Sequence, residues 1–187
     1  MIHGFLKACT VSPALRVADC AFNTQQTIAA MQRAALDGAQ LAVFPELGLT
    51  GYTCGDLFFQ QPLQRAAAKG LAAVLEASAG LDLVALVGLP VAVDGKLYNC
   101  AAVVCHGKLL GLVPKTYLPN YGEFYEQRQF NPAPAGVRTL HFAGQEVPFG
   151  TQLLFAARRC RSFASASRCA RTCGRRCRRA RTTRSRA

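Results

Sequence analysis

Two charged residues follow apolar segments that end in proline. Glu46 comes directly after residues 41–45, and Lys115 comes after residues 108–113 and one proline. In α/β proteins, functional side chains usually lie at the ends of strands. A carboxylate there could act as a general base, and an ammonium could stabilise negative charge on a reacting group. Taken alone, each residue is more typical of a solvated loop, so the surrounding segments have to decide its role.

The apolar segments of the chain would bring these two residues to one edge of a sheet. Segments with the length of strands occur at residues 5–11, 41–45, 83–89, 97–105 and 108–113. Glu46 and Lys115 would then project from the same edge. A carboxylate beside an ammonium keeps both groups charged, so this arrangement is chemically sensible.

Two helices are predicted between the strands. Asn23 is expected to cap a helix that ends at Gly38, and residues 57–79 are rich in Ala and Leu at helical spacing. The order of strand, helix, strand, helix and strand predicts an α/β domain with a mixed sheet.

Turns and a loop follow these elements. Asp94-Gly95 and His106-Gly107 are turn signals between strands and predict a hairpin. Residues 117–134 are aromatic, charged and contain proline, which predicts an ordered loop with a short helix. Regular periodicity ends beyond Phe155.

Longer segments around the two charged residues resemble a known superfamily. Residues 44–52 read Phe-Pro-Glu-Leu-Gly-Leu-Thr-Gly-Tyr and resemble the glutamate motif of the nitrilase superfamily. Residues 115–126 read Lys-Thr-Tyr-Leu-Pro-Asn-Tyr-Gly-Glu-Phe-Tyr-Glu and resemble its lysine motif. The extensions at residues 17–23, 53–58 and 121–126 resemble the glutaminase domain of glutamine-dependent NAD(+) synthetases. The resemblance covers residues 1 to 155.

This resemblance implies a nitrilase-type α-β-β-α sandwich, incomplete at the C-terminus, and a Glu–Lys–Cys triad. Glu46 would be the general base, which takes the thiol proton and later activates water. Lys115 would stabilise the oxyanion of the tetrahedral intermediate. Glu123 matches the second glutamate of the family, which positions the substrate and Lys115, and Tyr121 lies where these synthetases contact glutamine.

The nucleophile of the triad is missing from the sequence. The family carries it in a motif similar to Val-Glu-Ile-Cys-Glu-Asp-Leu-Trp, whereas residues 165–180 are a mixture of Arg, Ala, Ser, Cys, Gly and Thr. Codons built across the residue junctions of 167–174 can spell Glu-Val-Cys-Glu-Asp-Leu-Trp. We therefore hypothesise a change of reading frame near residues 155–158, which sequencing the underlying DNA would test.

The charge of the chain divides at the same place. The formal net charge is +12, with 22 Lys and Arg against 10 Asp and Glu. Twelve of the arginines, and none of the acidic residues, lie in residues 158–187, so residues 1–157 are formally neutral. We predict a nitrilase-like domain at 1–157 and an out-of-frame, disordered tail at 158–187. A basic field is not a property of the globular part, which argues against nucleic acid as its partner.

The cysteines of the tail do not suggest a working site. Cys169 lies near the expected nucleophile position but lacks its strand and acidic neighbours, so we do not assign it as nucleophile. Cys169, Cys173 and Cys177 are spaced at four residues among arginines and without a nearby His, which disfavours a metal site.

The predicted activity is therefore hydrolysis of the glutamine amide to supply ammonia for ATP-dependent NAD(+) synthesis from deamido-NAD(+). We expect the chain as written to be inactive because the cysteine motif is absent. ATP and Mg are expected only in a synthetase domain that this chain lacks, and no cofactor is expected here. The resemblance implies homo-oligomers, and the lack of a signal peptide or a long apolar run predicts a cytoplasmic protein without a membrane span.

Three alternatives stay open. The chain could be a stand-alone nitrilase-family amidase, it could bind nucleic acid through its Arg-rich tail, or it could be a remnant that does not close its fold.

Overall fold

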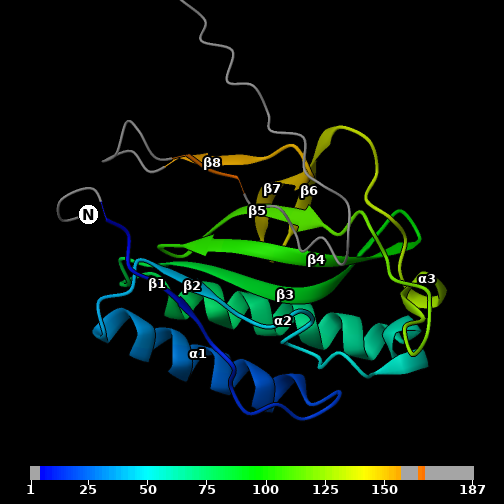
Figure 1. The fold of residues 1–187 in the computed structure, drawn as a ribbon, viewed down its shortest axis with the longest axis horizontal. Coiled ribbons are helices and arrows are strands. Elements are labelled where there is room, and N and C mark those ends of the chain that lie inside the picture. Colours follow the sequence, from blue (N-terminus) through cyan, green and yellow to red (C-terminus); the bar gives the residue numbers. More distant parts are fainter. Residues whose placement is uncertain (1–4, 157–163, 167–187) are drawn as a thin grey trace, which may run out of the picture.

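A mixed seven-stranded sheet forms the centre of the molecule (Figure 1). The computed structural model describes residues 5–156 and 164–166. In spatial order the strands of the sheet are β1 (Ala8–Thr10), β2 (Leu41–Val43), β3 (Val84–Val93), β4 (Lys96–Cys105), β5 (Lys108–Pro114), β7 (Gln145–Gly150) and β6 (Val137–Phe142). Strands β1, β2 and β3 are parallel, and β3, β4 and β5 form an antiparallel meander. The predicted α/β class with a mixed sheet is confirmed.

The turns of the meander follow directly from the sequence. Asp94 and Gly95 have φ angles of 49° and 73°, and His106 and Gly107 have 48° and 75°. Positive φ at both central residues of a two-residue hairpin matches the twist of the flanking strands, and Gly provides it without strain. These turns set the register in which Asn99 of β4 lies beside the end of β5, where Lys115 begins the next segment.

Two helices that run in the same direction cover one face of the sheet (Figure 1). They are α1 (Cys20–Leu36) and α2 (Gln61–Ala77). Met31 of α1 and Leu71 and Val74 of α2 are almost completely buried against the sheet. Burying each such side chain contributes about 1.5–3 kcal/mol before the entropy cost of ordering it. The resemblance implies four layers; the described residues form one helical layer and one large sheet.

The helix α1 begins earlier than predicted. Its N-cap is Asp19, whose carboxylate accepts a hydrogen bond from the backbone N–H of Phe22 at 3.0 Å. Asn23 was expected to be the cap, but it lies inside the helix and is fully buried. Its amide instead donates to the carbonyl oxygens of Arg16 and Leu49, so it joins the helix to the loop that follows β2.

The second predicted helix is divided in two. A 3-10 helix, η1 (Gly55–Phe59), is followed by the extended residue Gln60, and α2 begins at Gln61 with a proline in its first turn. Proline is favoured in the first turn of a helix because no hydrogen bond is lost there. The prediction of a continuous helix over residues 57–79 was therefore wrong at the start of that range.

Two further strand pairs, in the last third of the chain, were not expected from the sequence. The hairpin β6–β7 extends the sheet beyond β5, and β8 (Leu154–Ala156) pairs with β9 (Ala164–Ala166) in a separate two-stranded sheet. β8 lies across the face of the large sheet opposite the helices (Figure 1). A Cβ atom on Gly111 of β5 would lie only 2.8 Å from the ring of Phe155, so glycine allows this close packing.

Candidate functional site

Lys115 is held at the end of β5 by its backbone. Its N–H donates to the carbonyl oxygen of Asn99 at 2.8 Å, and its own carbonyl accepts from Ala133 at 3.0 Å. The residue is only 1% exposed, although lysine is almost never fully buried unless it is paired. The lysine must therefore have partners for its ammonium inside the protein.

Glu46 lies in a sharp turn after β2. Phe44 still donates to Leu86 of β3 at 3.0 Å, and Leu47 then adopts a left-handed φ of 53°. A left-handed conformation is uncommon for a residue with a Cβ atom and is maintained only by its surroundings. Leu47 is fully buried, which provides that constraint and turns the preceding carboxylate away from the core.

The turn rests directly on a glycine of β3. A Cβ atom on Gly88 would lie 2.5 Å from the nitrogen of Leu47 and 2.6 Å from the oxygen of Pro45. Gly88 also accepts a hydrogen bond from the N–H of Leu49 at 3.2 Å. Glycine is thus required at this position for the segment that carries Glu46 to reach its place.

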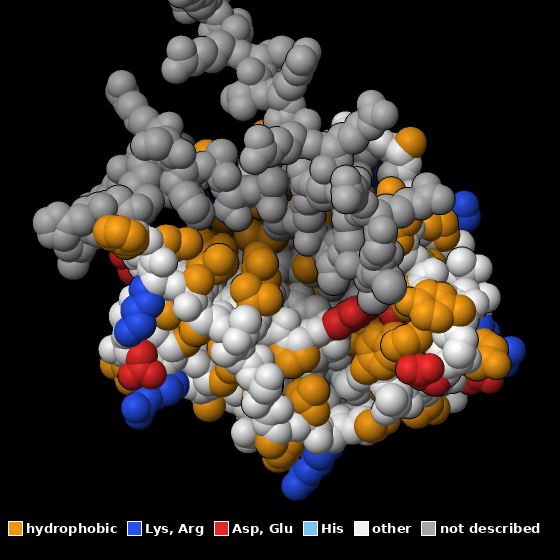
Figure 2. All heavy atoms as spheres, viewed as in Figure 1, with side chains coloured by type: hydrophobic (Ala, Val, Ile, Leu, Met, Phe, Trp, Pro, Cys, Tyr) orange, Lys and Arg blue, Asp and Glu red, His pale blue; other side chains and the backbone are white. Residues whose placement is uncertain are grey.

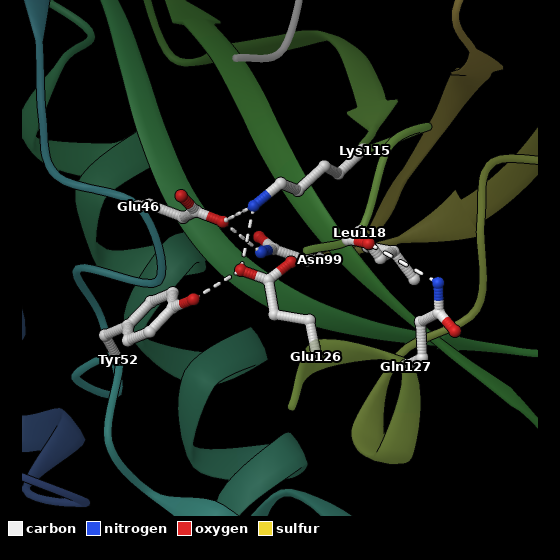
Figure 3. A network of polar contacts seen from close by, with 7 residues as sticks. All are labelled: Glu46, Tyr52, Asn99, Lys115, Leu118, Glu126 and Gln127. Atoms are coloured by element: carbon white, nitrogen blue, oxygen red, sulfur yellow. Dashed lines mark hydrogen bonds and ion pairs between the residues drawn. The ribbon is translucent and has the colours of Figure 1, made fainter. Parts of the chain in front are cut away.

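The charged side chains meet in one network (Figure 3). The ammonium of Lys115 lies 2.6 Å from Oε1 of Glu46 and 2.8 Å from Oε1 of Glu126. The amide of Asn99 donates to the same oxygen of Glu46 at 2.5 Å. The hydroxyl of Tyr52 donates to Oε1 of Glu126 at 2.5 Å. Four separate elements therefore contribute to one cluster of two carboxylates and one ammonium.

The environment of Lys115 favours its charged form. Burial lowers the pKa of this lysine, but hydrogen bonds from its ammonium to Glu126 and Glu46, together with their negative charges, outweigh burial. The pKa consequently lies above the ordinary lysine value of 10.5. The ammonium is a fixed positive charge at neutral pH, as an oxyanion-stabilising group has to be.

Tyr52 is held in its neutral form. Burial, the hydrogen bond to Glu126 and the negative charges of Glu126 and Glu46 all raise the pKa of this phenol. The hydroxyl can then act only as a donor to Glu126. The other carboxylate oxygen of Glu126, Oε2, is buried and has no hydrogen-bond partner among the described residues.

Glu126 occupies the place beside Lys115 for which Glu123 was predicted. It begins the short helix α3 (Glu126–Gln129) and is 4% exposed, whereas Glu123 is exposed. The N–H of Glu126 donates to the carbonyl of Pro119 at 3.2 Å, which turns the side chain inwards. The structure thus places Glu126, and not Glu123, against the ammonium of Lys115. The motif 115–126 already contained this residue, but the sequence did not show where the loop turns.

Tyr121, the other predicted binding residue, lies in the same loop but outside the network. It is 56% exposed, and its ring packs edge-to-face against Phe124 with centroids 5.8 Å apart. The exposed tyrosines 117 and 125 lie nearby in the sequence. Asn99 and the hydroxyl of Tyr52 were missed as site residues, although an amide within the apolar segment 97–105 was a usable signal.

The described cysteines do not resemble an activated nucleophile. Burial raises the pKa of Cys20 to about 11, and burial also raises the pKa values of Cys54 and Cys105. Reactive cysteines have depressed pKa values in electropositive surroundings. Cys169, with Cys173 and Cys177, lies outside the described residues.

The surface of the described part shows no large basic area on the face in view. Lys and Arg side chains are scattered there between hydrophobic and uncharged groups (Figure 2). In the described part of the chain, no helix has the length and apolar character to cross a membrane. Nor do those residues include a group of three or more His, Cys, Asp or Glu suited to a metal ion.

Comparisons with known sequences find a family and several relatives. The model of the carbon-nitrogen hydrolase family matches residues 7–162. A glutamine-dependent NAD(+) synthetase of Mycobacterium bovis is 41% identical over 155 residues, which are 83% of this chain and 23% of that protein. One of Thermotoga maritima is 39% identical over 110 residues, which are 59% of this chain and 19% of that protein. The chain spans about a quarter of the length of these curated relatives or less.

Comparisons with solved structures agree with the fold. A glutamine-dependent NAD(+) synthetase from Cytophaga hutchinsonii has a TM-score of 0.76 at 26% identity, covering 82% of this chain and 26% of that one. One from Acinetobacter baumannii has a TM-score of 0.65 at 30% identity, covering 75% of this chain and 26% of that one. A nitrilase-superfamily amidase from Nesterenkonia is similar in fold, with a TM-score of 0.59 at 22% identity. The match covers 79% of this chain and 56% of that one.

Proposed function

Because this chain belongs to the carbon-nitrogen hydrolase family, we propose that its Glu46–Lys115 site serves hydrolysis of the side-chain amide of glutamine. The observation that carries this proposal is the buried ammonium of Lys115 between the carboxylates of Glu46 and Glu126. The similarity to a glutamine-dependent synthetase at 41% identity supports glutamine as the substrate, and Tyr121 is the proposed contact to glutamine.

Glu46 is the proposed general base. Its side chain is 33% exposed, so it reaches the open side of the network while one oxygen contacts Lys115. It would take the proton of a cysteine thiol, and the thiolate would attack the amide carbon. Returning that proton to the leaving nitrogen releases ammonia and leaves a thioester. Glu46 would then take a proton from water, which hydrolyses the thioester to glutamate and frees the thiol.

Lys115 and Glu126 have supporting roles. During both steps the carbonyl oxygen becomes negative, and the fixed ammonium of Lys115 would stabilise it. Glu126 would keep that ammonium charged and in place, since its carboxylate lies 2.8 Å from Nζ and is almost completely buried. Glu126 therefore takes over the positioning role predicted for Glu123.

We further propose that the chain as written does not complete this reaction. The described cysteines have raised pKa values or lie within the strands, and the nucleophile motif is readable only in the shifted frame of residues 167–174. In this account the ammonia would pass to a synthetase domain that uses ATP and Mg, in a cytoplasmic homo-oligomer. These partners and this location are what the resemblance of the motifs implies.

Ammonia release tests the proposal. Glutamine is incubated with the chain as written and with a protein whose reading frame is restored after residue 155. We expect ammonia only from the second protein. Release by the chain as written would overturn our account of the nucleophile, and no release by the restored, folded protein would overturn the assigned activity.

The same assay distinguishes the stand-alone amidase alternative. A simple amide such as acetamide replaces glutamine at equal concentration, again with the restored protein. We expect a clear preference for glutamine, because the loop that carries Tyr121 belongs to the part that resembles the synthetases. Equal or better turnover of acetamide would favour an amidase.

A further inference from the structure

We propose that Asn99 is a positioning residue that fixes Glu46 and Lys115 relative to each other. Its side-chain amide contacts Glu46 and its backbone carbonyl contacts Lys115. This inference rests on the proposed function for its catalytic meaning, but the contacts themselves do not depend on it. Asn99 does not touch the reacting atoms in this scheme and acts through the other two residues.

The backbone contact extends the sheet by one step. The ladder between β4 and β5 ends with Cys100 opposite Pro114, where proline cannot donate a hydrogen bond. The next donor along the chain is the N–H of Lys115, which binds the carbonyl of Asn99 at 2.8 Å. Lys115 thus starts from a defined backbone position although it lies beyond the last residue of the strand.

The side-chain contact explains why an amide stands inside an apolar strand. Asn99 is 1% exposed, and a buried amide without hydrogen-bond partners destabilises a fold. Its Nδ2 donates to Oε1 of Glu46 at 2.5 Å, which satisfies the amide through a charged acceptor. A hydrophobic residue at this place would leave Glu46 with one donor fewer.

Asn99 also decides which oxygen of Glu46 is free. Oε1 accepts hydrogen bonds from both Asn99 and Lys115. Within the described part of the chain, the other oxygen, Oε2, has no such contact, and the side chain is one-third exposed. With Oε1 occupied by two donors, Oε2 is the oxygen that can accept a proton from a thiol or water. Asn99 therefore orients the base as well as holding it.

The test uses the chain as written and the ammonium of Lys115 as the reporter. Lysine is labelled with ¹⁵N at Nζ, and the signal of Lys115 is identified by its loss in Lys115→Met. Exchange of the ammonium protons with water is then compared between wild type, Asn99→Leu and Asn99→Asp. Backbone amide spectra of each variant establish that the fold is retained.

A second asparagine supplies the matched control. Asn131 is partly buried and donates to the carbonyl of Leu97 at 3.3 Å, and among the described residues it has no hydrogen bond to a charged side chain. Asn131→Leu also removes a side-chain amide that lies beside β4. A purely structural effect of losing an asparagine would appear in both leucine variants.

We expect Asn99→Leu to accelerate proton exchange at the Lys115 ammonium about tenfold. The reason is that Glu46 loses a hydrogen bond to its charged carboxylate and holds the ammonium less firmly. Asn131→Leu should leave the exchange unchanged. For Asn99→Asp, the exchange rate at Lys115 relative to that of wild type should be largest at neutral pH and should decrease on acidification. The carboxyl group introduced at position 99 can again donate to Glu46 once it is protonated.

Two results would overturn the proposal. One is a folded Asn99→Leu protein in which Lys115 exchanges as in wild type, or no faster than in Asn131→Leu. The other is a folded Asn99→Asp protein in which the exchange rate at Lys115, relative to that of wild type, does not depend on pH. Neither readout requires glutamine or a nucleophile, so failure of the ammonia assay and failure of this test can be told apart.

Discussion

At the scale of single residues, the site is a balance of charges around the buried side chains of Lys115, Asn99 and Glu126. One ammonium lies between two carboxylates, and the neutral hydroxyl of Tyr52 and the amide of Asn99 supply further donors. The sequence predicted Glu46 and Lys115 because each stands after a strand within a long motif. It could not predict Glu126 in place of Glu123, because the choice depends on where residues 117–130 turn inwards.

The raised pKa of Lys115 predicts a loss of stability at high pH. A group with a raised pKa stabilises the fold fully below its ordinary value, 10.5, and this contribution is lost as pH rises through the folded value. The gap in free energy of unfolding between wild type and Lys115→Met should therefore narrow above about pH 10.5. Urea unfolding from pH 8 to 11.5 measures this, with the exposed Lys108→Met as control. Parallel curves for wild type and Lys115→Met would contradict it.

The hydroxyl of Tyr52 should contribute to stability because Glu126 already has one buried oxygen without a partner. Tyr52→Phe should lower the free energy of unfolding by about 1–3 kcal/mol. Tyr121→Phe, which removes an exposed hydroxyl, should change it by less than about 0.5 kcal/mol. Chemical unfolding measures both, and equal effects of the two variants would rule out a special role of the Tyr52 hydroxyl.

At the scale of elements, the sequence predicted those strands of the sheet that are apolar segments bounded by clear turn residues. The turns at Asp94-Gly95 and His106-Gly107 defined the meander β3–β4–β5 correctly. The hairpin β6–β7 was missed because no residue of β6 is fully buried and β7 contains Pro148. The cap at Asn23 was wrong because a contact distant in sequence, to Leu49, uses that amide.

The packing of the Glu46 turn on β3 gives a prediction at this scale. Gly88→Ala places a Cβ atom within 2.6 Å of the backbone of Pro45 and Leu47, so the turn must move. We expect a loss of about 1–3 kcal/mol in the free energy of unfolding, as for overpacked cores. Gly80→Ala is the control, since a Cβ atom there has no neighbour within 4 Å. Similar stability of both variants would show that the turn adapts without strain.

Contacts between η1 and α3 support Glu126 from the other side. Arg128 binds Asp56 through two hydrogen bonds of 2.9 and 2.8 Å, and the rings of Phe58 and Phe130 lie 4.9 Å apart. Asp56 and Arg128 are exposed, so their ion pair contributes little to stability. The pair instead joins η1 to α3.

At the scale of the whole molecule, one hydrophobic core joins the helices to the sheet. It extends from Met31 of α1 and Leu71 of α2 through the strands to Phe149 of β7. The predicted division at residue 157 stays a prediction: the family match extends to residue 162, and β9 pairs with β8. A protein ending at residue 156 should melt cooperatively and within a few degrees of the full chain, as calorimetry would show. A non-cooperative transition of the shorter protein would instead favour the remnant alternative.

The central claim is that Glu46 is the base of a carbon-nitrogen hydrolase site. The direct measurement is the rate of ammonia release from glutamine by the frame-restored protein with Glu46→Gln, beside Glu123→Gln as the matched control. Loss of a general base should lower the rate about 10²–10⁴-fold, while the exposed Glu123 should be replaceable with little effect on the rate constant kcat. If Glu46→Gln releases ammonia as fast as the unsubstituted protein, the assignment of this site is wrong.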